Sequence, residues 1–411
     1  MRRLAWLIAA TFPVAIVAAL AWFGAFTFVN GYLVRGLGRS NADWTAATLW
    51  LSGGMLFWYP LFTEISSRLG RRRTVTAGLS AAAASYVALA FVQDPFLIKV
   101  ALAIMGAAIV AFLVAWTPFV AEAGRDRPGQ AIAIAMLVLN VTGSGSLIAG
   151  GYIAGSQRYR LMFLVFGTLC AACVIAFHFL AKHIETIVAS DADHAGREEP
   201  VSMRKLTRPD LAALLGGPFF VVVLLGVFAA PFSFHTSNQL FPNLARDVHG
   251  LNETHIAMIV GIGRIPALVT LLAISRVVDR INVVRCYAVG LLCDAAMLAV
   301  IACAPSAGPV TAAYLTFYLV HGIVWGAALP AVNACATPRL RDSAFAITGM
   351  TEVVAIFLAG LVHNRLIVAG RSLPYVFVFC GAITGLAAAG LFAYSFTRHW
   401  RNARAAKQTA P

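Results

Sequence analysis

The feature that most constrains this chain is its succession of long apolar runs. About twelve stretches of roughly 20 residues carry few charges, and short charged clusters separate them. Only 12% of the 411 residues are charged, about half the share of a soluble domain. The sequence therefore predicts an all-α membrane protein with twelve transmembrane helices. The expected spans are 5–29, 44–66, 74–92, 96–120, 131–154, 161–181, 218–241, 255–275, 285–304, 308–332, 344–366 and 374–397.

These spans fall into two groups of six. We expect an N-terminal six-helix bundle over 1–181 and a C-terminal six-helix bundle over 218–397. The segment 182–217 mixes acidic and basic residues, which predicts a cytoplasmic linker with one short helix, and 398–411 is expected to be a cytoplasmic tail.

The positions of the basic residues predict the orientation. If the N-terminus is cytoplasmic, 22 of the 31 Lys and Arg residues lie in inner segments and 7 in outer ones. This bias favours two cytoplasmic termini and a cytoplasmic linker. The same basic residues form no aromatic-interleaved surface, so the net charge of +14 does not indicate a nucleic-acid partner.

The sequence predicts no cofactor and no metal. Of seven cysteines, Cys170 and Cys173 have redox or zinc spacing, but both lie inside an apolar run and no second pair accompanies them. We interpret them as packing residues. A nucleotide-binding G-x-x-x-x-G-K-[ST] loop is also missing from the sequence, so an ion or substrate gradient is the expected energy source.

The chain contains an internal repeat. Residues of the first half align with residues of the second half at one constant offset along the chain, the offset that takes Arg68 to Arg280. We call this offset the repeat shift, and it holds in two separate regions. With one residue added, it also aligns Ala131-Ile-Ala-Ile with Ala344-Phe-Ala-Ile. This pattern favours two parallel six-helix repeats, an arrangement found in transporters with a central site. The other pairs at the repeat shift are Arg73 with Arg285, Gly78 with Gly290, Leu79 with Leu291 and Pro118 with Pro330.

The loop between the second and third spans carries a family signature. It reads Ser67-Arg-Leu-Gly-Arg-Arg-Arg73 and resembles the G-x-x-x-D-R-x-G-R-R loop of the major facilitator superfamily, although Thr63 and Ser67 replace its first Gly and its Asp. The resemblance covers almost the whole chain. It implies a secondary transporter that alternates between inward and outward access.

The resemblance also implies a conformational latch at the inner helix ends. Its residues would be Glu64, Arg68, Gly70, Arg71 and Arg72, with Asp279 and Arg280 in the second copy of the loop. A tight turn at Gly70 would bring the arginines to carboxylates or helix C-termini of the other half. The alternative is that these charges only set the topology.

Two exporter patterns of the same family are incomplete. Leu102 occupies the arginine position of the R-x-x-x-G pattern that ends at Gly106. The segment from Gly145 to Gly150 has the spacing of G-P-x-x-G-G without its proline. These departures weigh against a standard drug–proton exporter.

Four ionisable side chains lie within the predicted spans at one depth near the middle of the membrane, at about 1.5 Å rise per residue: Arg264, Asp294, His321 and Glu352. Such residues are costly there and mark candidate sites. We expect Arg264, Asn140, His321 and Trp325 to bind substrate, and Glu352 and Asp294 to carry protons. The run Gly261-Ile-Gly-Arg-Ile-Pro266 predicts a break or a bend in its helix.

Purely structural roles stay open as alternatives for these residues. Arg264 and Asp294 could form a purely structural ion pair, and His321 could be an ordinary hydrogen-bonded histidine. By resemblance, the helix that carries Asp294 lies outside the cavity. We also predict that an anionic substrate at Arg264 weakens an Arg264–Glu352 pair and lets Glu352 take a proton.

We therefore predict a secondary active transporter of a small organic solute in a bacterial inner or plasma membrane. Its partners would be the lipid bilayer, the substrate, and protons or another coupling ion, and a monomer is expected. Arg264 favours an anionic substrate, whereas Trp50, Trp116 and Trp325 favour an amphipathic one. An enzyme is disfavoured because no nucleophile–base or metal cluster is evident by spacing. A non-transporting receptor or assembly factor, and a multidrug-type proton antiporter, stay open, as does the direction of transport.

Overall fold

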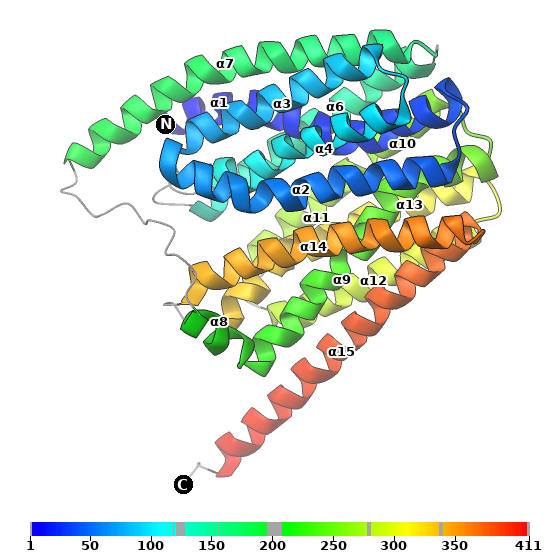
Figure 1. Ribbon diagram of the computed structural model, residues 1–411. Coiled ribbons are helices and arrows are strands. Elements are labelled where there is room, and N and C mark those ends of the chain that lie inside the picture. Colours follow the sequence, from blue (N-terminus) through cyan, green and yellow to red (C-terminus); the bar gives the residue numbers. More distant parts are fainter. Residues whose placement is uncertain are drawn as a thin grey trace. The chain divides into compact units, whose positions relative to one another are not determined.

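The computed structural model describes residues 2–117, 119–120, 128–155, 157–194, 208–277, 281–336 and 340–408. Within these ranges the chain is helical, without strands (Figure 1). The α-helices are α1 (Arg2–Ala19), α2 (Asn41–Leu69), α3 (Arg71–Phe91), α4 (Pro95–Ala111), α6 (Pro128–Gly155), α7 (Tyr159–His194), α8 (Arg208–Leu215), α9 (Pro218–Asn243), α10 (Glu253–Ile262), α11 (Arg264–Val277), α12 (Val283–Cys303), α13 (Ala307–Cys335), α14 (Arg341–Val368) and α15 (Leu373–Gln408). The π-helical segments are η1 (Leu20–Val29), η2 (Tyr32–Gly36), η3 (Phe112–Trp116) and η4 (Leu244–Val248).

Eleven helices of the described residues are long and apolar enough to span a membrane. They correspond to eleven of the twelve predicted spans and confirm a multi-pass membrane protein. The remaining span, 44–66, lies in α2, which has 29 residues but is not among the eleven. Its Trp, Gly, Ser, Thr and Tyr residues lower its mean hydropathy. The twelfth span and the orientation of the termini stay predictions.

Local signals set where several helices begin. The Ser40 side chain accepts a hydrogen bond from the Asp43 N–H, and the Asp43 side chain accepts one from the Ser40 N–H. This capping box starts α2. Asp94 caps α4 in the same way, with Pro95 in the first helical turn. Gly70 ends α2 and precedes α3 with a φ of +84°, as the predicted tight turn requires.

The helix boundaries bear out the internal repeat. The repeat shift takes the first residue of α3, Arg71, to the first residue of α12, Val283, and it takes their last residues, Phe91 and Cys303, onto each other as well. The same shift relates the starts of α2 and α10 and those of α4 and α13. The ends of α6 and α14 are related by the repeat shift with one residue added, which matches the sequence alignment of that region.

The repeat extends to the turns that follow the first and seventh spans. Each span ends in a π-helical segment, η2 and η4, and then a glycine with positive φ, Gly38 at +63° and Gly250 at +68°. Beside them the Arg39 N–H donates to the Leu33 carbonyl at 2.9 Å, and the Leu251 N–H donates to the Ala245 carbonyl at 3.0 Å. Glycine suits this left-handed position after a helix because it has no Cβ.

The linker and the tail are more helical than expected. α7 continues beyond the predicted span end at 181, to His194, and α15 continues to Gln408. The helices extend past the predicted span ends because a drop in hydropathy marks the end of an apolar span and not the end of a helix. The predicted short linker helix is confirmed as α8, Arg208–Leu215.

The chain forms two compact units. Unit 1 comprises 1–203, 242–265 and 360–368, and unit 2 comprises 204–241, 266–359 and 369–411. These units do not follow the two predicted bundles along the sequence, because 242–265 and 360–368 belong to unit 1.

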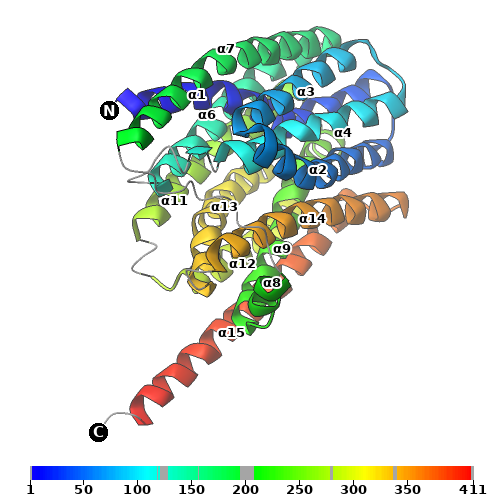
Figure 2. The same cartoon turned by 60° about the vertical axis from the view of Figure 1, so that its left-hand side comes forward.

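Close helix packing holds unit 1 together. α1 packs on α6 and α7, α3 packs on α4 and α7, and α2 packs on α4 (Figures 1 and 2). A Cβ atom at Gly54 of α2 would overlap the Ala103 backbone of α4, and the Trp58 indole N–H donates to the Ala103 carbonyl at 2.9 Å. Small residues let helices approach in this way within a bilayer.

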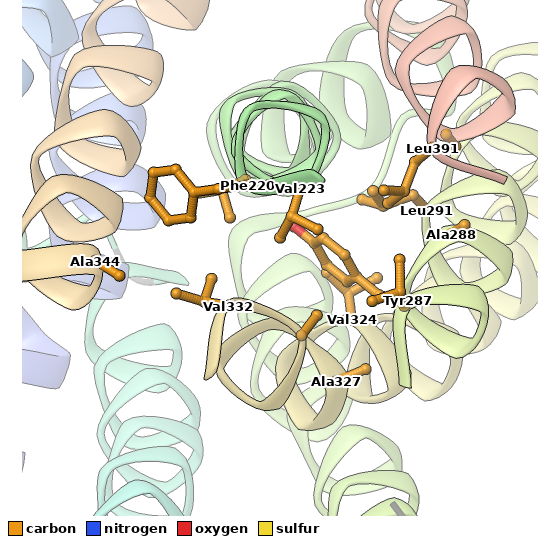
Figure 3. Packing of buried hydrophobic residues seen from close by; sticks show 14 of the residues in the cluster. Phe220, Val223, Tyr287, Ala288, Leu291, Val324, Ala327, Val332, Ala344 and Leu391 are labelled. Carbon is orange, nitrogen blue, oxygen red and sulfur yellow. The ribbon is translucent and has the colours of Figure 1, made fainter. Parts of the chain in front are cut away.

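Unit 2 has a continuous apolar core, in which α12 packs on α13 and α15. Figure 3 shows Val223 of α9, Leu291 of α12, Val324 of α13 and Leu391 of α15 around the Tyr287 ring. This core positions the polar side chains described next, because the same four helices carry or flank them.

Candidate functional site

A buried carboxylate–imidazole pair lies in unit 2. Nδ1 of His321 in α13 is 2.6 Å from Oδ2 of Asp294 in α12. The Ser233 hydroxyl of α9 donates to the same oxygen at 3.1 Å. Asp294 is 0% exposed and His321 1% exposed. A charge buried this deeply is tolerated because a partner and a hydrogen bond offset part of its desolvation.

Aromatic rings fix the orientation of the His321 imidazole. Phe234 and Phe317 stack against it, with ring centroids 4.8 Å and 5.4 Å away and interplanar angles of 9° and 15°. Trp325 meets the ring edge-on at 4.8 Å. The imidazole plane is therefore held so that Nδ1 points at Asp294.

Two more ionisable groups belong to this cluster. Glu352 of α14 is partly buried and interacts electrostatically with His321. Tyr287 is fully buried and lies within electrostatic reach of both Glu352 and Asp294. Three of the four predicted mid-membrane groups, Asp294, His321 and Glu352, are thus brought together. We call them, with Tyr287, the α12–α14 cluster.

The helix beside this cluster is unusually polar. The α9 side chains Ser233, His235, Thr236, Ser237, Asn238 and Gln239 are all buried. The Tyr318 hydroxyl donates to Oδ1 of Asn238 at 2.6 Å, and the Asn238 amide donates to the Phe234 carbonyl at 2.8 Å. Polar side chains at membrane depth generally line functional paths, so α9 joins the candidate site.

Arg264 lies in unit 1, at the predicted helix break. α10 ends at Ile262, and α11 begins at Arg264, so the helix is interrupted at Gly263, as predicted, although Gly263 keeps right-handed helical angles. The Arg264 side chain is fully buried, and its Cζ lies 3.1 Å from the centroid of the Phe23 ring in η1. π-Helical segments often occur at functional sites. Arg264 therefore has a cation–π contact, and the predicted Arg264–Glu352 pairing stays a prediction.

Asn140 of α6, also in unit 1, is buried. Its amide N–H donates to the Met136 carbonyl at 2.9 Å, and its Oδ1 has no hydrogen-bond partner among the described residues. An oxygen in this state can accept a hydrogen bond from a substrate.

A second polar group in unit 1 surrounds the two repeat-related turns. Arg246 donates through Nε to Oε1 of Glu253 at 2.8 Å, and Nε of Arg35 lies 3.6 Å from that oxygen. Asn30 and Asn243 form an amide–amide hydrogen bond between the end of the first span and the end of α9. Burial lowers the pKa of His249, which follows Arg246 in the chain, and so disfavours the charged form of its imidazole.

Comparison with protein-family profiles assigns the chain to a family. The profile of the Major Facilitator Superfamily matches residues 11–360. The chain belongs to this superfamily. A search of curated proteins found no match.

Solved transporter structures share the fold of the chain. A mutant form of the nucleoside transporter NupG aligns at a TM-score of 0.74 and 13% identity, over 94% of this chain and 99% of that one. A transporter of the POT family, solved with a thioalcohol-conjugated peptide, aligns at 0.72 and 11% over 96% of both chains. At such identities the likeness concerns the fold alone.

The loop with the superfamily signature forms some of the contacts that the predicted latch needs. Nε of Arg68 lies 2.5 Å from Oε1 of Glu64, so the acid and base of the predicted latch pair one helical turn apart, with the Arg68 side chain 74% exposed. Arg71 and Arg72 line a small pocket with Trp116. Asp279 and Arg280 lie outside the described residues. The latch role stays a prediction.

Sequence reasoning missed the polar group around Arg246. It counted Arg35 and Arg246 as outer-loop charges because each follows an apolar run. The repeat was the signal that could have found them. The repeat shift aligns Asn41 with Glu253, and with one residue added it aligns Asn30 with Asn243.

Proposed function

We propose that this protein is a proton-coupled secondary transporter of a small organic solute, working by alternating access in a bacterial inner or plasma membrane. The observation that carries the proposal is the buried Asp294–His321 pair, with Glu352 beside it. A membrane protein gains no stability from such a pair that apolar packing would not supply, so a transport role explains it better.

The α12–α14 cluster is suited to accept and release one proton. The imidazole of His321 binds the proton, and the carboxylate of Asp294, 2.6 Å away, compensates the added charge. We assign to Glu352, the less buried of the two carboxylates, the exchange of the proton with water and its relay to His321. The groups that surround the Asp294–His321 pair are Tyr287 of α12 and Ser233 of α9, on the side of Asp294, and Glu352 of α14, on the side of His321.

Arg264 is the proposed contact for an anionic group on the substrate. A guanidinium binds a carboxylate or phosphate through two parallel hydrogen bonds, and the Phe23 ring fixes its plane. Asn140 adds an acceptor in the same unit. The related nucleoside and peptide transporters make nucleosides and dipeptides the first compounds to test.

The test is a proton-flux assay in proteoliposomes. Purified protein is reconstituted with pyranine inside the vesicles, and nucleosides, dipeptides, aromatic carboxylates and sugar phosphates are added outside. We expect one class to change the internal pH, and we expect His321→Gln to abolish that change. His178→Gln is the matched control, because His178 is exposed on α7 of unit 1, away from the cluster.

Two outcomes would contradict the proposal. Solute flux without proton movement would remove the coupling and leave a facilitator. Binding without flux of any compound would favour the alternative of a non-transporting receptor.

A further inference from the structure

The polar group at the two repeat-related turns forms one continuous chain of hydrogen bonds. Arg246 donates to Oδ1 of Asn30, the Asn30 amide donates to Asn243, and the Asn243 amide donates to Oδ1 of Asn41 at 2.6 Å. The Asn41 amide then donates to Oδ2 of Asp247 at 2.8 Å. We call these five residues the asparagine relay.

The relay has a fixed direction. It begins at a cation, Arg246, and ends at an anion, Asp247, and each of its three amides accepts from the preceding member and donates to the next. Oδ1 of Asn243 also accepts from Arg246 at 3.4 Å. Hydrogen bonds arranged head to tail in this way polarise and strengthen one another. Asn30 and Asn243 are fully buried, so a broken link would leave polar atoms without water.

Every amide link of the relay joins the same two corners of the chain. One corner, 30–41, connects the first span to α2, and the other, 243–253, connects α9 to α10. Arg35 and Glu253 add an ion pair at 3.6 Å between the same corners. Gly31 makes the approach possible, since a Cβ there would lie 3.0 Å from the Tyr159 hydroxyl and 3.1 Å from Oε2 of Glu253.

We infer that the asparagine relay is a conformational latch that holds the 30–41 and 243–253 corners together, and that it must break when this end of the protein opens. It lies at the helix ends opposite to the Arg68 loop, which the charge bias places outside the cell. Its chemistry also differs from that of the latch predicted at the Arg68 loop. Most of its hydrogen bonds between the two corners are made by neutral amides, which do not titrate. The inference rests on alternating access, but not on the proposed proton site.

A substitution of one atom tests the direction of the relay. Asn243→Asp keeps the shape of the side chain but replaces its donor with an acceptor that faces Oδ1 of Asn41. Asn364→Asp is the matched control at the same end. Oδ1 of Asn364 accepts from the Thr45 hydroxyl at 3.0 Å, and a carboxylate in its place can accept the same hydrogen bond.

The readout is the reactivity of a single cysteine below the relay. Thr27 is buried one turn before Asn30, so Thr27→Cys, on a background without the seven native cysteines, reacts with maleimide only when this end opens. In nanodiscs we expect Asn243→Asp to raise the reaction rate about tenfold, which corresponds to about 1.4 kcal/mol. We expect Asn364→Asp to leave it unchanged.

The assay needs neither substrate nor a pH gradient, so its outcome is independent of the proton site. An unchanged rate in Asn243→Asp, with protein that still folds, would overturn the latch. If that variant does not fold, Asn41→Asp decides, since Asn41 is partly exposed and the exchange replaces only the amide that donates to Asp247. Its Thr27→Cys rate should rise about threefold, and no rise would equally overturn the inference.

Discussion

Replacing His321 by Phe is the substitution that isolates the charge of the Asp294–His321 pair from its packing. A phenyl ring fits between Phe234 and Phe317, where the imidazole now stacks at 4.8 Å and 5.4 Å. The aromatic contacts are therefore kept, and Asp294 loses its partner. Among the residues that the structure describes, the Ser233 hydroxyl, at 3.1 Å, then remains as the hydrogen-bond donor to that carboxylate.

The magnitude follows from the burial of both groups. Removing one partner of a buried pair costs about 3–5 kcal/mol, and the remaining Ser233 hydrogen bond offsets about 1 kcal/mol. We therefore expect His321→Phe to lower the free energy of unfolding by about 2–4 kcal/mol. Asp294→Leu alone leaves a neutral imidazole without its acceptor and should cost about 1–2 kcal/mol. The double variant should lie within about 1 kcal/mol of the wild type, because apolar groups then replace both partners.

The assay is unfolding at equilibrium in mixed micelles, followed by tryptophan fluorescence. His178→Phe is the control for introducing a phenyl ring, and it should change the free energy of unfolding by less than about 0.5 kcal/mol because His178 is exposed. Additive effects of His321→Phe and Asp294→Leu, within about 0.5 kcal/mol, would refute the reasoning, since they would mean that the two side chains do not stabilise each other.

Three further predictions concern orientation, the Arg68 loop and the substrate. Single cysteines at Ser190 and Asn252, on a cysteine-free background, should react with an impermeant thiol reagent in intact cells only at Asn252, and reaction at Ser190 alone would reverse the orientation. Arg68→Ala with Arg71→Ala should slow transport in proteoliposomes several-fold while abundance in the membrane stays the same, and an unchanged turnover would leave these arginines a purely topological role. Arg264→Lys should weaken binding of an anionic substrate at least tenfold by calorimetry, because an ammonium lacks the planar fork of guanidinium; equal affinity would place the anionic group elsewhere.

The positions of the helices could be predicted from the sequence because each depends on a local or periodic signal. Apolar runs located eleven of the spans, and the repeat shift between Arg68 and Arg280 anticipated the matching boundaries of α3 and α12. The glycines and proline around Arg264 anticipated the break between α10 and α11. The ends of α7 and α15 could not be found this way, since hydropathy does not distinguish a helix that continues beyond the bilayer from a loop.

The partners of the polar side chains depend on rotation about the helix axis, and depth alone does not give it. The sequence placed Asp294 and His321 at one depth but assigned Asp294 to a helix outside the cavity. The structure shows the two in contact. Asn30 and Asn243 lie far apart along the chain, so proximity in sequence did not point to their hydrogen bond. Both are uncharged, so the cost of burying a charge in the membrane did not mark them as a site either.

The most direct test of the proton-coupled account compares two assays on Glu352→Gln, with a transported compound from the proton-flux screen. One assay measures exchange of labelled for unlabelled compound at equal pH on both sides, and the other measures accumulation driven by a pH gradient. A glutamine cannot relay a proton to His321 but keeps the size of the side chain. The account predicts exchange close to the wild-type rate and no accumulation above the equilibrium level. Undiminished accumulation in Glu352→Gln would contradict it and remove Glu352 from the coupling mechanism.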